Sequence, residues 1–317
     1  DRNIFSYNAL SNFIETTGDP LIKSLFQKLN TKNFELIMQQ LDNFCEIVEI
    51  FSDDKTLVPK IKAVSEKLKN SLIDAVKELH PEHVFKVPEE KSQACIQFLQ
   101  EYLNKNGLVF STNYDLLLYW VLMRNGADNA IDGFGRDLET DLDDGHYVEP
   151  DDLEYSELRW GKYKEEQTVY YLHGTLPIFD TGINIVKAQY DEEHYLLQNV
   201  KDRIDKKEYP IFVTAGNGKE KLTHIMHNKY LSFCYDQLCN IEGSLVTFGF
   251  NFGEYDTHII DAINVAAKMG RKIPDKLWSV YIGVYSDENL KHIIEIKDKF
   301  KCKVTPYNAR TANIWGT

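Results

Sequence analysis

Polar side chains follow two apolar, strand-like segments of this sequence, at places where they could bind a substrate and act on it. Asn113 comes after segment 108–112, and His173 comes after segment 168–172. An amide side chain offers both a donor and an acceptor. A histidine titrates near neutral pH, so it can exchange a proton with a substrate hydroxyl. Because Gly174 follows His173, we expect this histidine in an open turn with space for a ligand.

The residues around Asn113 have a second interpretation. Thr112 and Asp115 are residue types that cap helices, because their side chains accept a hydrogen bond from a free backbone amide. A helix-capping turn therefore remains an alternative to a substrate site in this segment.

A third apolar segment, 244–250, leads into a turn that contains Gly249, Asn251 and Asp256. Glycines in a strand-to-helix turn let the backbone approach a ligand. The N-terminus of the following helix favours a phosphate or a carboxylate that binds hydroxyls. We therefore expect this turn to contribute to a binding site.

The segment 211–215 is followed by Gly216 and Asn217, with Lys219 available for a phosphate. The spacing and the Lys-Ser/Thr ending of a nucleotide triphosphatase loop are absent. We expect Gly216 and Asn217 to contribute to cofactor binding, with a plain glycine turn as an equally good interpretation of this segment.

The elements that carry these residues alternate between strands and helices. The predicted strands are 108–112, 168–172, 211–215, 244–250, 278–284 and 302–307. The predicted helices between and after them are 115–124, 188–206, 220–240, 256–269 and 287–300. This order predicts an α/β fold with a Rossmann-like, mostly parallel sheet flanked by helices. Ligands of such sheets bind outside the carboxyl ends of the strands, which is where Asn113 and His173 are expected.

The first part of the chain is predicted to be helical. Apolar residues recur three and four positions apart in 34–51 and again in 57–79, and a further helix is expected over about 91–105. We therefore predict a helical N-terminal subdomain, 1–106, and a Rossmann-like catalytic domain, 107–317.

Composition narrows the functional classes. The chain has 317 residues and a formal net charge of −13, and such an acidic surface disfavours direct nucleic-acid binding. The sequence shows neither a membrane-spanning run nor a signal peptide, so we expect no membrane association and a cytoplasmic location.

The acidic stretch 137–157 is interpreted as a solvated loop rather than a metal site. The five cysteines form no C-x-x-C pair, so neither a structural zinc nor a disulfide framework is indicated.

Together, the strand-end motifs resemble the sirtuin-like NAD-binding superfamily. These motifs are T-N-Y-D at 112–115, D-G-F at 132–134, L-H-G at 172–174 and G-F-x-x-x-x-x-D at 249–256. The similarity covers most of residues 100–317. It is nearest to the prokaryotic members that lack a zinc ribbon and act in anti-phage defence as NAD hydrolases. The segment A-G-N-G-K and the long helical N-terminal part resemble a bacterial group within that branch.

The resemblance implies roles for the matching residues. Asn113 matches the asparagine that contacts the ribose and positions the attacking water, and His173 matches the catalytic histidine. Asp115 matches an acidic position behind the asparagine, and Thr112 and Asp115 are both expected at the cofactor site. The region that receives the adenosine half of the dinucleotide corresponds to Gly249, Asn251 and Asp256.

The activity implied by the resemblance is hydrolysis of NAD, the substrate, to nicotinamide and ADP-ribose or a cyclic variant, with no metal. The branch also implies a defence effector that acts as a homo-oligomer and responds to a regulatory partner or a phage-derived trigger. In the family, a glycine-rich turn after the first strand cradles the pyrophosphate. This sequence opens at Asp1, as though just after that turn.

Two alternatives stay open. The protein could be a non-catalytic sensor of NAD or an ADP-ribose derivative, or an assembly module with a decayed pocket. Deacetylation of acetyl-lysine shares the first chemical step, but no zinc module or peptide-binding element is recognisable.

Overall fold

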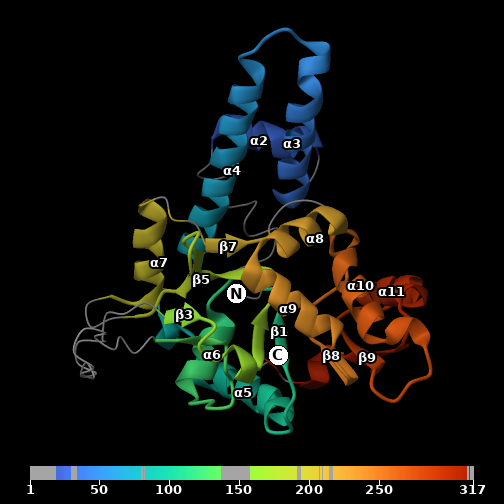
Figure 1. Cartoon of the computed structure of the whole chain (residues 1–317). Coiled ribbons are helices and arrows are strands. Elements are labelled where there is room, and N and C mark those ends of the chain that lie inside the picture. Colours follow the sequence, from blue (N-terminus) through green and yellow to red (C-terminus); the bar gives the residue numbers. More distant parts are fainter. Residues whose placement is uncertain are drawn as a thin grey trace. The chain divides into compact units, whose positions relative to one another are not determined.

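The computed structural model describes most of the chain (Figure 1). The described residues are 19–29, 34–79, 81, 83–136, 158–190, 194–206, 208, 210–213, 217–312 and 314. The first 18 residues, the acidic stretch 137–157 and Gly216 lie outside the described residues. The structure therefore does not test the predictions made for them. Among the described helices, none is long and apolar enough to cross a membrane.

The chain forms two compact units. The first comprises 1–81 and 214–221, and the second comprises 82–213 and 222–317. This division falls earlier than the boundary predicted at residue 106. The reason is that α5 (Glu89–Leu103) contacts β1 (Val109–Ser111) and α6 (Leu117–Arg124), and its apolar residues join the core of the second unit.

The first unit is helical. It contains α2 (Pro20–Leu29), α3 (Phe34–Phe51) and α4 (Leu57–Leu79), and the predicted bounds 34–51 and 57–79 are confirmed. Helices α3 and α4 pack against each other, and α2 contacts both. Their apolar stripes supply the buried residues of this unit, which include Ile22, Phe26, Ile37, Leu41, Val48, Val64 and Leu68.

Two parallel sheets in the second unit confirm the predicted α/β class. In the first sheet, β1 pairs with β4 (Val169–Tyr171). The second sheet has the order β10-β9-β8, formed by β8 (Gly243–Thr247), β9 (Leu277–Val284) and β10 (Lys303–Asn308). The flanking helices are α9 (Lys229–Cys239), α10 (Thr257–Ala266) and α11 (Asp287–Ile296). Helix α9 contacts β4, and α11 contacts β9 (Figure 1).

A third sheet is antiparallel, which the sequence did not predict. Its order is β2-β3-β6-β5-β7, and its strands are β2 (Phe134–Gly135), β3 (Leu158–Trp160), β5 (Gly174–Asp180), β6 (Ile185–Lys187) and β7 (Pro210–Phe212). The strand predicted over 211–215 is present as β7, but it pairs antiparallel and does not belong to a parallel sheet. Strand β5 begins only a few residues after β4, which leaves no room for a crossover helix, so β5 turns back into a hairpin with β6 and pairs antiparallel with β7.

Two predicted helices also differ from the observed ones. The predicted helix 188–206 is confined to α7 (Leu196–Asp205), since the described residues 188–190 and 194–195 are not helical. The predicted helix 220–240 is divided into α8 (Gly218–His227) and α9. Asn228 takes an extended conformation there, and its side chain accepts hydrogen bonds from the amides of Tyr230 and Leu231. The division is therefore a new helix cap.

Candidate functional site

The two principal candidates lie at the carboxyl ends of neighbouring parallel strands, as predicted. The register pairs Ser111 of β1 with Tyr171 of β4, so Asn113 and His173 each come two residues past this last pair. The amide of Leu172 donates to the carbonyl of Ser111 at 2.8 Å, which extends the ladder beyond the strand ends. Parallel pairing therefore brings together two segments that are far apart in the sequence.

The loop that carries Asn113 is held from both sides. The Asn113 amide donates to Ser111 Oγ at 3.1 Å. The Tyr114 hydroxyl donates to the carbonyl of Val213 at 2.7 Å, and the Thr175 hydroxyl lies 3.1 Å from the Tyr114 carbonyl. Asn113 itself is exposed, and its side chain makes no hydrogen bond to the described residues. The loop thus presents a positioned amide to solvent, next to a half-buried Thr112.

Asp115 is a buried helix cap, so the capping alternative is confirmed for this residue. Its Oδ1 accepts from the amide of Leu117 at 2.8 Å, in the first turn of α6. Its exposed fraction is 7 %. Burial raises the pKa of Asp115 to about 6, against the opposing effect of the Leu117 amide. The carboxyl therefore changes charge close to neutral pH.

His173 does not lie in an open turn, and this expectation is corrected. Only 3 % of the residue is exposed, because β5 begins at Gly174 and β7 runs beside it. Gly174 has φ +80°, and a Cβ at this position would meet the carbonyl oxygen of Ile211 at 1.8 Å. The glycine therefore serves the close approach of two strands and does not open space for a ligand.

The partner of His173 is a second histidine. The Nε2 atoms of His173 and His258 are 2.8 Å apart, and their ring centroids are 5.1 Å apart. His258 lies in the first turn of α10 and is 1 % exposed. Its carbonyl accepts from the Tyr235 hydroxyl at 3.0 Å. One nitrogen of the pair must donate while the other accepts, so one proton lies between the two rings.

Asp256 joins this histidine pair. A carboxylate oxygen of Asp256 and one nitrogen of each histidine all lie within 4.8 Å of one another. Two histidines and a carboxylate can ligate a divalent transition metal. Two imidazoles on one tetrahedral zinc would, however, hold their nitrogens about 3.3 Å apart, given zinc–nitrogen bonds of about 2.0–2.1 Å. At 2.8 Å the two nitrogens share a proton, so the chemistry that this arrangement supports directly is proton exchange.

The other predicted binding residues have separate surroundings. Gly249 has φ +70° and follows β8. Asn251 is exposed, and its carbonyl lies 3.1 Å from Nε2 of His292 in α11. Asn217 is part of the first unit, where its side chain accepts from the amides of Lys219 and Glu220. It therefore caps α8, in agreement with the plain-turn interpretation.

Sequence reasoning missed His258. The motif that pointed to this region ends at Asp256, two residues earlier. The remaining signal was a histidine at the start of the apolar helical run 258–263, where a polar side chain is buried and needs a polar partner. Nothing in the local pattern identifies that partner, because His173 lies 85 positions away.

Comparison with known proteins assigns the chain to a family. The family model that matches it, described as a domain of unknown function (DUF4917), covers residues 2–315. No curated protein matches the sequence. Because the family match spans nearly the whole chain, the protein belongs to the DUF4917 family.

Proposed function

We propose that this protein cleaves the nicotinamide–ribose bond of NAD with water, which gives nicotinamide and ADP-ribose or a cyclic variant. The observation that carries the proposal is the buried contact between His173 and His258 at the carboxyl end of β4, beside the exposed Asn113 after β1. That edge is where parallel α/β sheets bind their ligands. The resemblance of the strand-end motifs supplies the identity of the substrate.

The reaction needs positioning more than a strong nucleophile. When the bond between ribose C1′ and the nicotinamide nitrogen breaks, its electron pair leaves with neutral nicotinamide, and the sugar becomes oxocarbenium-like. A water oxygen then bonds to C1′ and gives up a proton. Asn113 has the donor and acceptor to hold a ribose hydroxyl and this water. In our proposal the histidine pair receives the proton.

His258 acts in this scheme as a positioning residue. Its contact with Nε2 of His173 fixes the tautomer of the catalytic ring. The nearby Asp256 carboxylate offsets the positive charge when the pair takes up a proton. A second proton is disfavoured, because it would place two like charges at hydrogen-bond distance.

The biological role that fits this chemistry is an anti-phage defence effector that depletes NAD. Constitutive depletion would harm the host, so we propose control through homo-oligomerisation, a regulatory protein partner or a phage-derived trigger. Expression of the wild type without a trigger should then be tolerated. When the trigger is present, the wild type should arrest growth and Asn113→Ala should not. Equal toxicity of the two forms would count against this role.

The proposed roles are tested by mutation of the full protein. We expect Asn113→Ala and His173→Ala each to lower the rate of nicotinamide release by roughly 10²-fold or more. His258→Gln should lower kcat more than it raises KM and should shift the pH profile, because it changes the acid–base partner of His173. His224→Ala is the matched control, since His224 is exposed on α8, and it should leave the rate unchanged.

One outcome would overturn the assigned residue roles, and two others would favour an alternative function. Hydrolysis that persists in both Asn113→Ala and His173→Ala would overturn the assigned roles. NAD binding without turnover by the wild type would favour a sensor. No NAD binding under any condition would favour an assembly module.

A further inference from the structure

A cavity of about 310 Å³ lies beside the candidate site, within the second unit. This volume is at the lower end of the range for small-molecule sites. Tyr119 of α6 and Tyr171 of β4 contribute to its wall. Tyr171 stands two residues before His173, so the cavity adjoins the strand end that carries the histidine pair. None of its lining residues belongs to that pair.

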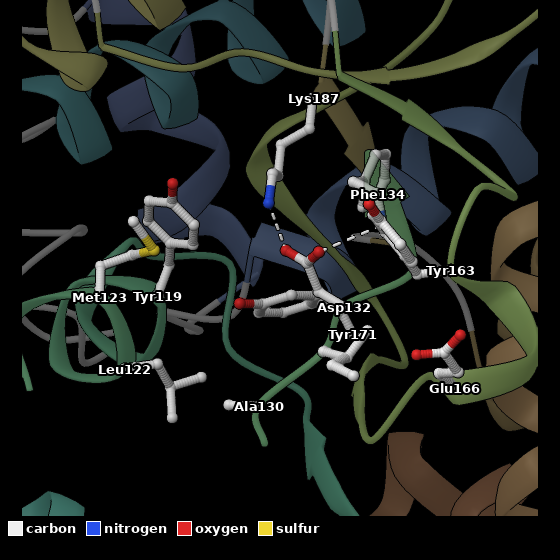
Figure 2. Close-up of a pocket in the computed structure, with 11 residues that line it drawn as sticks. Tyr119, Leu122, Met123, Ala130, Asp132, Phe134, Tyr163, Glu166, Tyr171 and Lys187 are labelled. Carbon is white, nitrogen blue, oxygen red and sulfur yellow. Dashed lines mark hydrogen bonds and ion pairs between the residues drawn. The ribbon is translucent and has the colours of Figure 1, made fainter. Parts of the chain in front are cut away.

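One end of the cavity holds a buried ion pair. Lys187 of β6, whose side chain is 7 % exposed, donates to the carboxylate of Asp132, whose side chain is 15 % exposed. Asp132 also accepts from the amide of Phe134 at 3.2 Å. The Lys187 ammonium lies 4.8 Å from the ring centroid of Tyr119 and 5.2 Å from that of Phe134. Figure 2 shows Lys187 reaching down to Asp132, with Tyr119 on one side and Phe134 on the other.

This end of the cavity retains unused hydrogen-bonding capacity. Within the described part of the chain, Asp132 is the acceptor for the Lys187 ammonium, which leaves further N–H groups of the ammonium available. The hydroxyls of Tyr119 and Tyr171 make no hydrogen bond to described residues. Burial raises the pKa of Tyr119, and the nearby Asp132 charge adds to the effect. Burial also raises the pKa of Tyr171, so both hydroxyls remain protonated and can donate.

The ion pair also sets the charge that a ligand can carry. A ligand carboxylate would be drawn to Lys187 and repelled by Asp132. A ligand ammonium would have to displace Lys187 from its place between Tyr119, Phe134 and Asp132. A neutral group with an acceptor beside a donor meets neither penalty, because its oxygen can accept from Lys187 or a tyrosine while its N–H donates to Asp132.

Away from the ion pair the lining is mostly apolar. Leu122, Ala130 and Ile131 line this part, and Leu122 and Ala130 lie away from the ion pair in Figure 2. Glu166 also belongs to the lining, but it is exposed to solvent, so its charge is screened and affects a ligand less than the buried pair does. Aromatic rings and aliphatic side chains together favour a flat, apolar ligand body.

We propose that this cavity binds a small, neutral aromatic amide, with its amide group at the Asp132–Lys187 pair and its ring between the aromatic and aliphatic walls. The site is independent of the proposed NAD chemistry, since no step of that chemistry uses the pair.

Three probes with the same ring test the proposal: benzamide, benzoate and protonated benzylamine. Each is titrated into the full protein without NAD, and binding is followed by isothermal titration calorimetry or ligand-detected NMR. We expect benzamide to bind at least about tenfold more tightly than either charged analogue, because each charged head group leaves one member of the buried pair without compensation. Equal binding of all three probes, or no binding of benzamide, would overturn the proposal.

Variants locate the binding and separate it from misfolding. Asp132→Asn removes the carboxylate and leaves the Lys187 charge, so the preference should change from benzamide to benzoate. This gain of benzoate binding cannot come from an unfolded protein. Ala130→Phe should fill the apolar end and abolish benzamide binding, whereas Glu165→Gln, an exposed neighbour outside the cavity, should leave it unchanged. Unaltered benzamide binding in Ala130→Phe would contradict the location.

The His173→Ala variant distinguishes this proposal from the proposed function. We expect it to lose nicotinamide release and to retain benzamide binding. Loss of benzamide binding in a folded His173→Ala protein would place the ligand at the histidine pair and overturn the cavity site.

Discussion

Replacement of Asp115 by asparagine should stabilise the protein at neutral pH and do so less at acidic pH. The asparagine oxygen can still accept from the Leu117 amide, so the cap of α6 is retained. What changes is the charge. Burial raises the pKa of Asp115 from 3.8 to about 6, so the ionised form is less favourable in the folded protein than in the unfolded chain.

The sign follows from the number of bound protons. Between pH 3.8 and about 6 the folded state holds more of the Asp115 proton than the unfolded state does. Stability contributed by this residue is therefore present at low pH and is lost as the pH rises through this window. A shift of about 2 units corresponds to a loss of about 3 kcal/mol above pH 6, of which about 1.5 kcal/mol falls between pH 5 and pH 7.5.

The assay is urea unfolding of the wild type and Asp115→Asn at pH 5 and pH 7.5, followed by tryptophan fluorescence, to which the buried Trp120 in α6 contributes. The stability of the variant relative to the wild type should increase by about 1.5 kcal/mol between the two pH values. Any fixed cost of burying the amide cancels in this comparison. Asp128→Asn, an exposed neighbour, should show no such change. A difference that is the same at both pH values would refute the reasoning.

Two further predictions concern the backbone. Gly174→Ala should lower the free energy of unfolding by about 3 kcal/mol, because its Cβ would meet the Ile211 carbonyl at 1.8 Å and its φ is +80°. Gly182→Ala, with φ +81° and nothing within 4 Å, should cost only about 1–2 kcal/mol of strain; equal urea midpoints for the two variants would speak against the steric argument. Asn228→Ala should cost about 1 kcal/mol, since it removes the acceptor for two amides of α9. An unchanged melting temperature by calorimetry would show that this cap is dispensable.

The sequence correctly predicted the helices and strand ends whose positions depend only on short stretches of the chain. The helices 34–51 and 57–79 were placed correctly because an apolar stripe with helical spacing is visible without knowledge of any partner. The neighbouring positions of Asn113 and His173 followed from two apolar runs that end in polar turns. Both inferences depend on short stretches of sequence.

The antiparallel sheet was missed although a turn signal was present. Between β5 and β6, Asp180 accepts from the Gly182 amide and Thr181 bonds to Asn184, which is typical of a hairpin. The strands around it are almost wholly buried, so the alternation that marks an exposed antiparallel sheet is lost.

The contacts that complete both sites join distant parts of the chain. His173 meets His258 across 85 positions, and Lys187 meets Asp132 across 55. Sequence indicated the polar residue types at several of these positions. It could not indicate the pairing, because burial and partner choice are set by how the elements pack.

The central claim is that this protein uses water to release nicotinamide from NAD. The most direct measurement incubates the purified full protein with NAD and quantifies nicotinamide and ADP-ribose by chromatography over time, alongside His173→Ala. The account predicts that the wild type forms nicotinamide in step with ADP-ribose or its cyclic form, while His173→Ala forms neither above the uncatalysed rate. NAD that stays intact with the purified wild type, or equal product formation by His173→Ala, would contradict it.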